Sequence, residues 1–256
     1  MLVPKVARRF AHMGSTNDAL LQALSGAEEV PHGAVYITDD QTAGRGQGAN
    51  RWHSSPGDNL TFSMLVMPDQ LSVDRIFALT QYASLAVHRG LTTMLPTLDE
   101  KQLRVKWPND LYAGNRKLGG ILIQNGLRGS GVQWSVIGVG LNVNEREFPP
   151  ELQRSATSLY HILGEAVDRS SLLEHIFAGF TYWYDELETQ GFDRLHAAYH
   201  ERLYRLGERH RFRRVADDEV FTAVVQGTDG RGHLRLVLDD AQLETFELRS
   251  IQWLPA

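Results

Sequence analysis

A run of strand-like segments between residues 103 and 144 constrains the fold more than any other feature of the chain. The segments LRVKW, KLGGILIQ and WSVIGVGLNVN are separated by the turn signals AGNR and GLRGSG, which predicts a three-stranded antiparallel meander. Apolar residues recur at helical spacing in residues 72–95 and again in 170–190. The second repeat ends at Gly191, and a further helix is expected through Tyr204. The chain is therefore predicted to combine long core helices with an antiparallel sheet.

The first third of the chain contains a loop that is too polar and too rich in glycine to be a regular element. The capping sequence GSTND at residues 14–18 predicts a short helix that ends near Gly26. Residues 33–38 and 60–67 are typical of strands. The roughly 20 residues between them, 39–59, show no periodicity, and a loop of that length in a compact domain is more often functional than not.

The last 50 residues have a different character. Four short strand-like segments, HRFRRV, EVFTAVVQ, HLRLVL and QLETFEL, predict a small β-barrel at about residues 206–256. Five arginines between Arg205 and Arg214 form a local basic run, but residues 205–256 carry a net charge of −1. That balance is unlike a nucleic-acid-binding module, and a solvated edge is the favoured interpretation.

Composition excludes several kinds of chemistry. The chain has 256 residues and no cysteine, so disulfides, thiolate metal sites and cysteine nucleophiles are ruled out. Its formal net charge of −5 gives no global field for nucleic acid. The longest apolar stretches fall well short of the roughly 18–20 residues that a membrane span needs, and no signal-peptide core is seen. We expect a soluble, cytoplasmic protein.

The segment KWPND at 106–110, followed by RKLGGIL at 116–122, gathers charge at one place. The chain has only four lysines, and two of them, Lys106 and Lys117, lie here. A hairpin with residues 113–116 as its loop pairs Tyr112 with Lys117 and Asp110 with Gly119. Lys106, Asp110, Tyr112, Lys117 and Gly119 then share one face, and Val105, Trp107, Leu111, Leu118 and Leu122 share the apolar one. Two ammonium groups beside a carboxylate could receive a polyanion, or form a surface salt bridge on an ordinary hairpin.

Three other groups of residues are candidates for binding or metal ligation. The loop QTAGRGQGANRW at 41–52 offers glycines that allow close backbone approach, arginines that neutralise an anion and an indole that can stack on a base. Its partial match to a dinucleotide fingerprint is rejected because no helix can open after it. His196 and His200 have metal-ligand spacing, but without a third ligand a solvated helix face is the better interpretation. Asn142 and Asn144, in GVGLNVN, could hydrogen-bond a base or a carbonyl.

Together, GSTN at 14–17, QTAGRG at 41–46 with Trp52, KWPND, RKLGGIL and GVGLNVN at 138–144 resemble the biotin protein ligases. The resemblance implies an α+β fold with a mixed, mainly antiparallel sheet and helices on one side, as in class II synthetase-like biotin and lipoate ligase domains. It also implies a C-terminal SH3-like barrel. The expected domains are a catalytic domain at residues 1–205 and the barrel at residues 206–256. Too few residues precede Ser15 for the DNA-binding domain of some members, so no repressor role is expected.

The resemblance also implies a set of site residues. Lys117, Arg45 and Asp110 are expected to be catalytic, and Asp110 is the candidate magnesium ligand. The ATP site is expected at Trp52, Lys106, Asn109, Asp110 and Asn142. The biotin site is expected at Ser15, Thr16, Asn17, Gln41, Gly44, Arg45, Gly46, Lys117 and Gly120.

The implied reaction is ATP-dependent ligation of biotin to a lysine of a biotin carboxyl carrier protein through biotinyl-5'-AMP. ATP, Mg²⁺ and biotin are the expected small molecules, and a biotin-dependent carboxylase supplies the expected partner; neither DNA nor a membrane is expected. A homodimer is left open, because some relatives dimerise. A lipoate or octanoyl ligase and a non-catalytic binding protein are the competing interpretations.

The glycine-rich loop departs from the family pattern in one respect. Members often carry a second arginine and an Arg-Gly pair after GRG, whereas this chain has Gln47-Gly48-Ala49. We therefore expect the adenylate to be released more readily from this protein.

Overall fold

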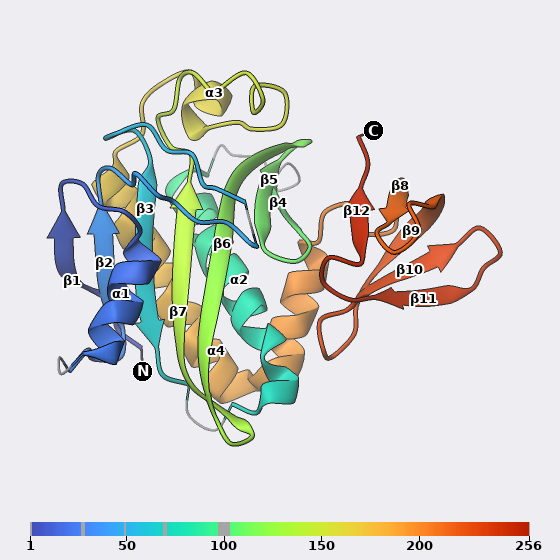
Figure 1. Cartoon of the computed structure of the whole chain (residues 1–256), viewed down its shortest axis with the longest axis horizontal. Helices are drawn as coiled ribbons and strands as arrows, with labels where there is room; N and C mark the ends of the chain where they lie inside the picture. The colour runs from blue at the N-terminus through green and yellow to red at the C-terminus, as the bar shows by residue number, and fades with distance from the viewer. Residues whose placement is uncertain (1, 27–28, 49, 69–70, 97–102, 256) are drawn as a thin grey trace.

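The computed structural model describes residues 2–26, 29–48, 50–68, 71–96 and 103–255. Its centre is a seven-stranded sheet in the order β1-β2-β3-β7-β6-β5-β4 (Figure 1). Only the β1–β2 pair is parallel, and the other neighbours are antiparallel. The strands are β1 Lys5–Phe10, β2 Ala34–Thr38, β3 Leu60–Val66, β4 Leu103–Lys106, β5 Asp110–Ala113, β6 Arg116–Arg128 and β7 Gly131–Leu141.

The long helices cover one face of this sheet. α2 (Phe77–Met94, after a 3₁₀ turn at Val73–Arg75) and α4 (Arg169–Glu201) lie behind it, and the short α1 (Thr16–Ser25) lies in front (Figure 1). α4 consists of two helical segments that meet at Gly191, whose φ of 75° is not helical, so the first segment ends there as expected and a second follows. A short α3 (Leu159–Leu163) lies near the end of β7. In the described ranges no helix is both long and apolar enough to cross a membrane.

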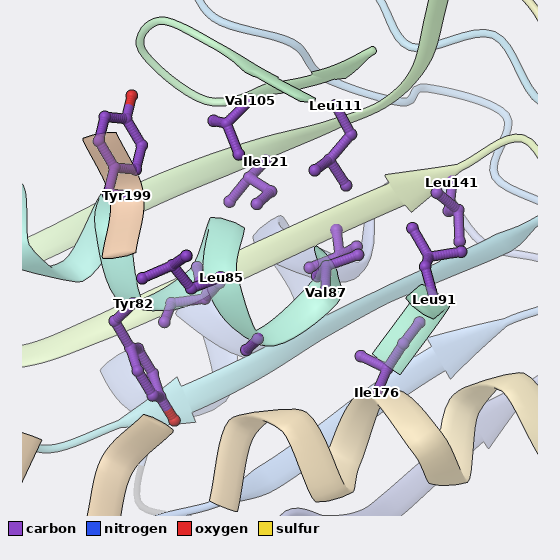
Figure 2. Close-up of a cluster of buried hydrophobic side chains, with 14 of the residues drawn as sticks. Tyr82, Leu85, Val87, Leu91, Val105, Leu111, Ile121, Leu141, Ile176 and Tyr199 are labelled. Carbon is purple, nitrogen blue, oxygen red and sulfur yellow. The ribbon is translucent and has the colours of Figure 1, made fainter. Parts of the chain in front are cut away.

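The core lies between the sheet and the two long helices. Figure 2 shows side chains of α2 gathered with side chains of β4 to β7, and Tyr199 and Ile176 of α4 lie at opposite ends of the cluster. Burying such side chains contributes about 1.5–3 kcal/mol each, so this layer supplies most of the stabilisation. The labelled members are Tyr82, Leu85, Val87, Leu91, Val105, Leu111, Ile121, Leu141, Ile176 and Tyr199, all nearly inaccessible to solvent.

A second sheet, of five strands, follows α4. It comprises β8 Arg209–Arg214, β9 Val220–Thr228, β10 Leu234–Leu238, β11 Leu243–Phe246 and β12 Ile251–Trp253, in the order β11-β10-β9-β8-β12. This fits the small β domain expected there, while the boundary at residue 206 stays a prediction. The two parts touch closely, because the Trp107 indole Nε1 donates to the carbonyl of Gly232 at 2.8 Å.

The predicted meander was wrong in one detail. Residues 103–141 form four strands, because KWPND is not continuous: β4 ends at Lys106, residues 107–109 make a turn with a cis Trp107–Pro108 bond, and β5 starts at Asp110. Proline lacks the N–H that a strand ladder requires, which is why the chain turns here.

We expect Gly90→Ala to lower the free energy of unfolding by about 1–3 kcal/mol. A Cβ at Gly90 would lie 2.6 Å from the Cα of Ile176, so α2 and α4 would have to separate. Denaturant unfolding measures the loss. Gly230→Ala is the control, because its Cβ would meet nothing within 4 Å. Equal stability of the two variants would contradict the close helix contact.

Stability should also fall below neutral pH because of His88. Burial lowers the pKa of His88 to about 4, and the charge of Arg202 adds to the effect. Since the unfolded group titrates near 6.5, the unfolded chain takes up the proton first as pH falls. The free energy of unfolding is unaffected by His88 above pH 6.5. It falls progressively as the pH drops toward 4, by about 3 kcal/mol in all. Urea unfolding of the wild type and His88→Gln across this range should show a shallower slope for the variant, and identical slopes would contradict it.

Candidate functional site

The floor of the site is a row of cross-strand neighbours that runs through the sheet. Asp110 in β5 pairs with Gly120 in β6, Gly120 pairs with Gly140 in β7, and Gly140 pairs with Thr61 in β3. Partners in register point to the same face, so two side-chain-free positions lie between a carboxylate and a hydroxyl. The next row is similar, because Gly138 separates Leu122 from Ser63.

The register of the β5–β6 hairpin is as expected next to the turn but is shifted by one residue farther from it. Tyr112 pairs with Lys117 as predicted, but a bulge between Leu111 and Tyr112 places Asp110 opposite Gly120 instead of Gly119. Gly119 therefore faces the core beside Leu141, and Leu122 lines the pocket instead of the core. A bulge inserts one unpaired residue and so moves the following side chains to the other face.

A pocket of about 160 Å³ opens over this glycine floor, between the N-terminus of α1 and the loop at residues 41–52. Eleven of the expected site residues line it: Ser15, Thr16, Asn17, Gln41, Arg45, Gly46, Trp52, Asn109, Asp110, Lys117 and Gly120. They come from segments up to about a hundred residues apart in the sequence, which the sheet brings together.

One end of the pocket is a buried, neutral hydrogen-bond network. Gln41 Oε1 accepts from the Thr16 backbone N–H at 2.9 Å and from its hydroxyl at 3.3 Å. Ser63 Oγ lies 2.7 Å from Thr16 Oγ1 and 2.5 Å from Asn17 Oδ1. The Asn17 amide donates in turn to Gln124 Oε1 at 3.0 Å. Such a network fixes the donors and acceptors that a small polar ligand would meet.

Ser63 and Gln124 were missed by sequence reasoning. Both occur in strand interiors, where an isolated polar residue looks like a solvent-facing position. The alternation of side chains along each strand could have found Ser63, because it points to the same face of the sheet as Gly138 and Gly140 of β7.

The opposite end of the pocket carries charge. Lys117 Nζ lies 2.6 Å from Asp110 Oδ1, and their side chains are 34% and 28% exposed. The ends of this ion pair lie near the position of the missing Gly120 side chain, because a Cβ there would be 3.2 Å from both Asp110 Oδ1 and Lys117 Nζ. Asn109 donates its amide to the Ile121 carbonyl, which fixes the turn beside them. Of the predicted charge cluster, the structure brings Lys117 and Asp110 together as a partly shielded ion pair at the pocket.

Lys106 does not line the pocket. Its Nζ donates to the Tyr112 hydroxyl at 3.2 Å and lies 4.8 Å and 5.5 Å from the ring centroids of Tyr112 and Trp253. Burial lowers the pKa of Lys106, whereas the nearby Asp110 raises it. The second sheet therefore draws this lysine away from the cluster in which it was expected.

Two further expected residues do not line the pocket but support the segments around it. Asn142 is buried and donates its amide to the Thr157 carbonyl at 3.0 Å, so it holds the segment before α3. Gly44 lies under the loop, where a Cβ would be 2.6 Å from the carbonyl oxygen of Trp52. Both positions shape the site without facing it.

Arg45 and Trp52 close the loop over the floor. Arg45 Nε pairs with Asp18 of α1 at 3.1 Å, with both side chains well exposed. The Trp52 indole packs on Gly140, since a Cβ there would be 2.4 Å from its Cε2 atom. Trp52 Nε1 and the hydroxyl of Thr61, which also lines the pocket, are buried without a hydrogen-bond partner among the described residues.

The histidine pair was expected on a solvated helix face, but both side chains are only partly exposed and are engaged in contacts. The rings of His196 and His200 are 4.2 Å apart, with His196 Nδ1 2.8 Å from the Gln81 amide. His200 Nε2 accepts from the Thr228 backbone N–H at 2.8 Å, and burial lowers its pKa to about 4. The pair joins α4 to α2 and to the second sheet. In the part of the chain that the structure describes, no group of three histidine, aspartate or glutamate side chains is placed to hold a metal ion.

Comparison with known proteins agrees with this geometry. A family model described as the biotin/lipoate A/B protein ligase family matches residues 10–142. The biotin--[acetyl-CoA-carboxylase] ligase of Mycobacterium tuberculosis is 32% identical over 231 residues, which are 88% of this chain and 81% of that protein. The bifunctional ligase/repressor BirA of Bacillus subtilis is 32% identical over 208 residues, 80% of this chain. The match spans 62% of the length of that relative.

Solved structures give the same fold. The biotin protein ligase of Aquifex aeolicus, in complex with biotin and ATP, superposes with a TM-score of 0.78 at 23% identity, covering 97% of this chain and 98% of that one. Since the family model matches more than half of the residues and the mycobacterial relative aligns over most of its length, this chain belongs to the biotin/lipoate A/B protein ligase family.

Proposed function

We propose that this protein ligates biotin to a lysine of a biotin carboxyl carrier protein, using ATP and forming biotinyl-5'-AMP. The observation that carries the proposal is one pocket with a neutral hydrogen-bonding end at Thr16 and Gln41 and a charged end at Lys117 and Asp110. A ureido ring matches the first end, and a carboxylate or phosphate matches the second.

The ligand would extend along the glycine floor between these ends. Ser15, Thr16, Asn17 and Gln41 surround the ureido head, with Gly44 and Gly46 shaping the loop above it. The valeryl chain crosses Gly140, and its carboxylate meets Lys117 and Arg45 beside Gly120. The nucleotide lies near Trp52, Asn109 and Asp110, with Lys106 and Asn142 behind them.

The chemistry has two balanced steps. A carboxylate oxygen of biotin attacks the α-phosphorus of ATP and pyrophosphate leaves. The amine of the carrier lysine then attacks the acyl carbon, AMP leaves, and the amine gives up its proton. Negative charge develops on the phosphoryl and then on the acyl oxygen, and the Lys117 ammonium and the Arg45 guanidinium stabilise it. The loop over the floor limits hydrolysis of the adenylate.

Magnesium fits this site only together with the nucleotide. Of the described residues that line the pocket, Asp110 alone has a carboxylate, and it is already paired with Lys117. Phosphate oxygens would therefore supply most of the ligands, as is common for Mg²⁺. The ion would neutralise charge on the phosphates, while Asp110 orients Lys117.

The carrier belongs to a biotin-dependent carboxylase in this proposal, by analogy with relatives named biotin--[acetyl-CoA-carboxylase] ligase. The absence of a repressor role, of DNA binding and of a membrane partner, the cytoplasmic location and the homodimer stay predictions.

Labelled biotin should be transferred to a purified carrier domain only with ATP and Mg²⁺, and Lys117→Ala should lower kcat/KM at least about 100-fold. The loss follows from removing the cation at the charged end of the pocket. Arg116→Ala, at the exposed neighbouring position, is the matched control and should retain activity. Transfer of lipoate instead, or binding without turnover, would contradict the proposal.

We expect Gln47→Arg to slow dissociation of biotinyl-AMP by about three- to tenfold, because a second guanidinium in the loop would pair with the phosphate. Gln47 lines the pocket, whereas Ala49 lies outside the described residues. Stopped-flow release of the adenylate measures the rate, with Gln47→Met as the uncharged control. Unchanged release in the arginine variant would show that the loop's departure from the family pattern does not govern retention.

A further inference from the structure

Glu145 is a buried carboxylate that the proposed reaction does not use. It follows β7 by four residues and is 2% exposed. Within the described ranges, no lysine or arginine is paired with it, and the nearest basic group is His53 Nε2 at 4.0 Å. A buried charge is costly unless it is compensated, so its hydrogen-bond partners indicate what it is for.

The partners of this carboxylate all belong to one segment. Glu145 Oε2 accepts from the Ser55 backbone N–H at 3.0 Å and from the Asn59 amide at 2.5 Å. Glu145 Oε1 accepts from the Ser55 hydroxyl at 2.5 Å. Hydrogen bonds to an ionised acceptor are roughly twice as strong as neutral ones. One carboxylate therefore compensates its burial by holding the downstream half of the glycine-rich loop.

The same residue fixes the surrounding elements. The carbonyl of Glu145 accepts from Ser158 Oγ at 2.7 Å, and Ser158 caps α3. Asn59 Oδ1 accepts from the Val143 backbone N–H at 2.9 Å. The segment after Trp52 is thus attached to the end of β7 and to the start of α3.

The middle of the loop is held differently from its two ends. At the upstream end, Thr42 and Ala43 donate their backbone N–H groups to the carbonyls of Met13 and Gly14 at 2.9 and 2.8 Å. Beyond them, Arg45 forms an exposed ion pair with Asp18, and the Gly46 N–H donates to Asn50 within the loop itself. Exposed ion pairs contribute little, with a median of about 0–1 kcal/mol. The described residues of the middle are therefore weakly held, and Trp52 lies where they meet the firmly attached downstream end.

Trp52 depends on these attachments for its place on the floor. Its Nε1 is buried without a partner among the described residues, and none of their side chains orients the indole by a hydrogen bond. Its backbone N–H donates to the Gly44 carbonyl at 3.0 Å, and three residues later Ser55 is bound by Glu145. The backbone on both sides, rather than the indole itself, holds the ring against Gly140.

We propose that Glu145 is a positioning residue that presets Trp52 for the nucleotide by clamping residues 53–59 to the end of β7. The inference rests on the proposed function, because it concerns the ATP half of that site. With the clamp in place, the loop is already ordered before ATP binds, so the entropy cost of ordering it does not reduce the affinity for ATP. The ureido end of the pocket, built on α1 and β3, is independent of the clamp.

Glu145→Ala should raise KM for ATP about tenfold while leaving KM for biotin within about twofold. Glu145→Gln should come within about threefold of the wild type, because its carbonyl oxygen retains two acceptor bonds and the Ser55 hydroxyl can turn to accept from the amide. Ser55→Ala, which removes only one donor, gives an intermediate value and covers the case in which Glu145→Ala fails to fold. Glu147→Ala is the control, because it is exposed two residues away.

Hydrogen exchange of the same full-length proteins, without substrates, provides a readout separate from activity. Residues 53–59 should exchange faster in Glu145→Ala, and β7 should not change. Unchanged exchange there, or a loss of stability with KM for ATP unaltered, would overturn the clamp. If the wild type transfers no biotin, the proposed function fails, and exchange together with calorimetric titration of ATP still decides whether the clamp serves nucleotide binding.

Discussion

A pocket can form on this face of the sheet because β7 carries no side chain at Gly138 and Gly140. A Cβ at Gly138 would lie 2.1 Å from Asn17 Oδ1, and one at Gly140 would lie 2.4 Å from the Trp52 ring. On the opposite face, Ile137, Val139 and Leu141 are buried against the long helices. One strand therefore alternates between core packing and open space, and both α1 and the glycine-rich loop come close to the sheet only because of that alternation.

The two ends of the pocket are supported by different parts of the molecule. The neutral end is held by hydrogen bonds among α1, β3 and β6, which all belong to the first sheet and its covering helix. The charged end lies next to the second sheet, whose Trp253 covers Lys106 and whose Gly232 carbonyl receives the Trp107 indole. The small β domain thus supports the charged end from behind, through Lys106 and Trp107.

The sequence predicted the helices, most strands and the main site motifs because each has a local signal. α1 begins with Ser15 as its N-cap, and β2 and β3 lie within a residue or two of their expected ranges. The bulge at Leu111 and Tyr112 has no local signal, so Asp110 was paired with Gly119 instead of Gly120. Lys106 was misplaced because Trp253, which draws it aside, lies about 150 residues later in the chain. Ser63, Gln124 and Glu145 act through neighbours that only the folded sheet supplies.

The turn between β4 and β5 places side chains in two different parts of the molecule within five residues. Lys106 and Asp110 are cross-strand partners, and Asp110 lines the pocket, while Trp107 between them reaches the second sheet. Tyr199 of α4 also donates to the Pro108 carbonyl at 2.8 Å, so the turn is enclosed from behind as well. Adding or deleting a single residue here would rotate either the indole or the carboxylate away from its partner. Surface turns usually accept changes of length, whereas this turn can change only by substitution if both contacts are to be kept.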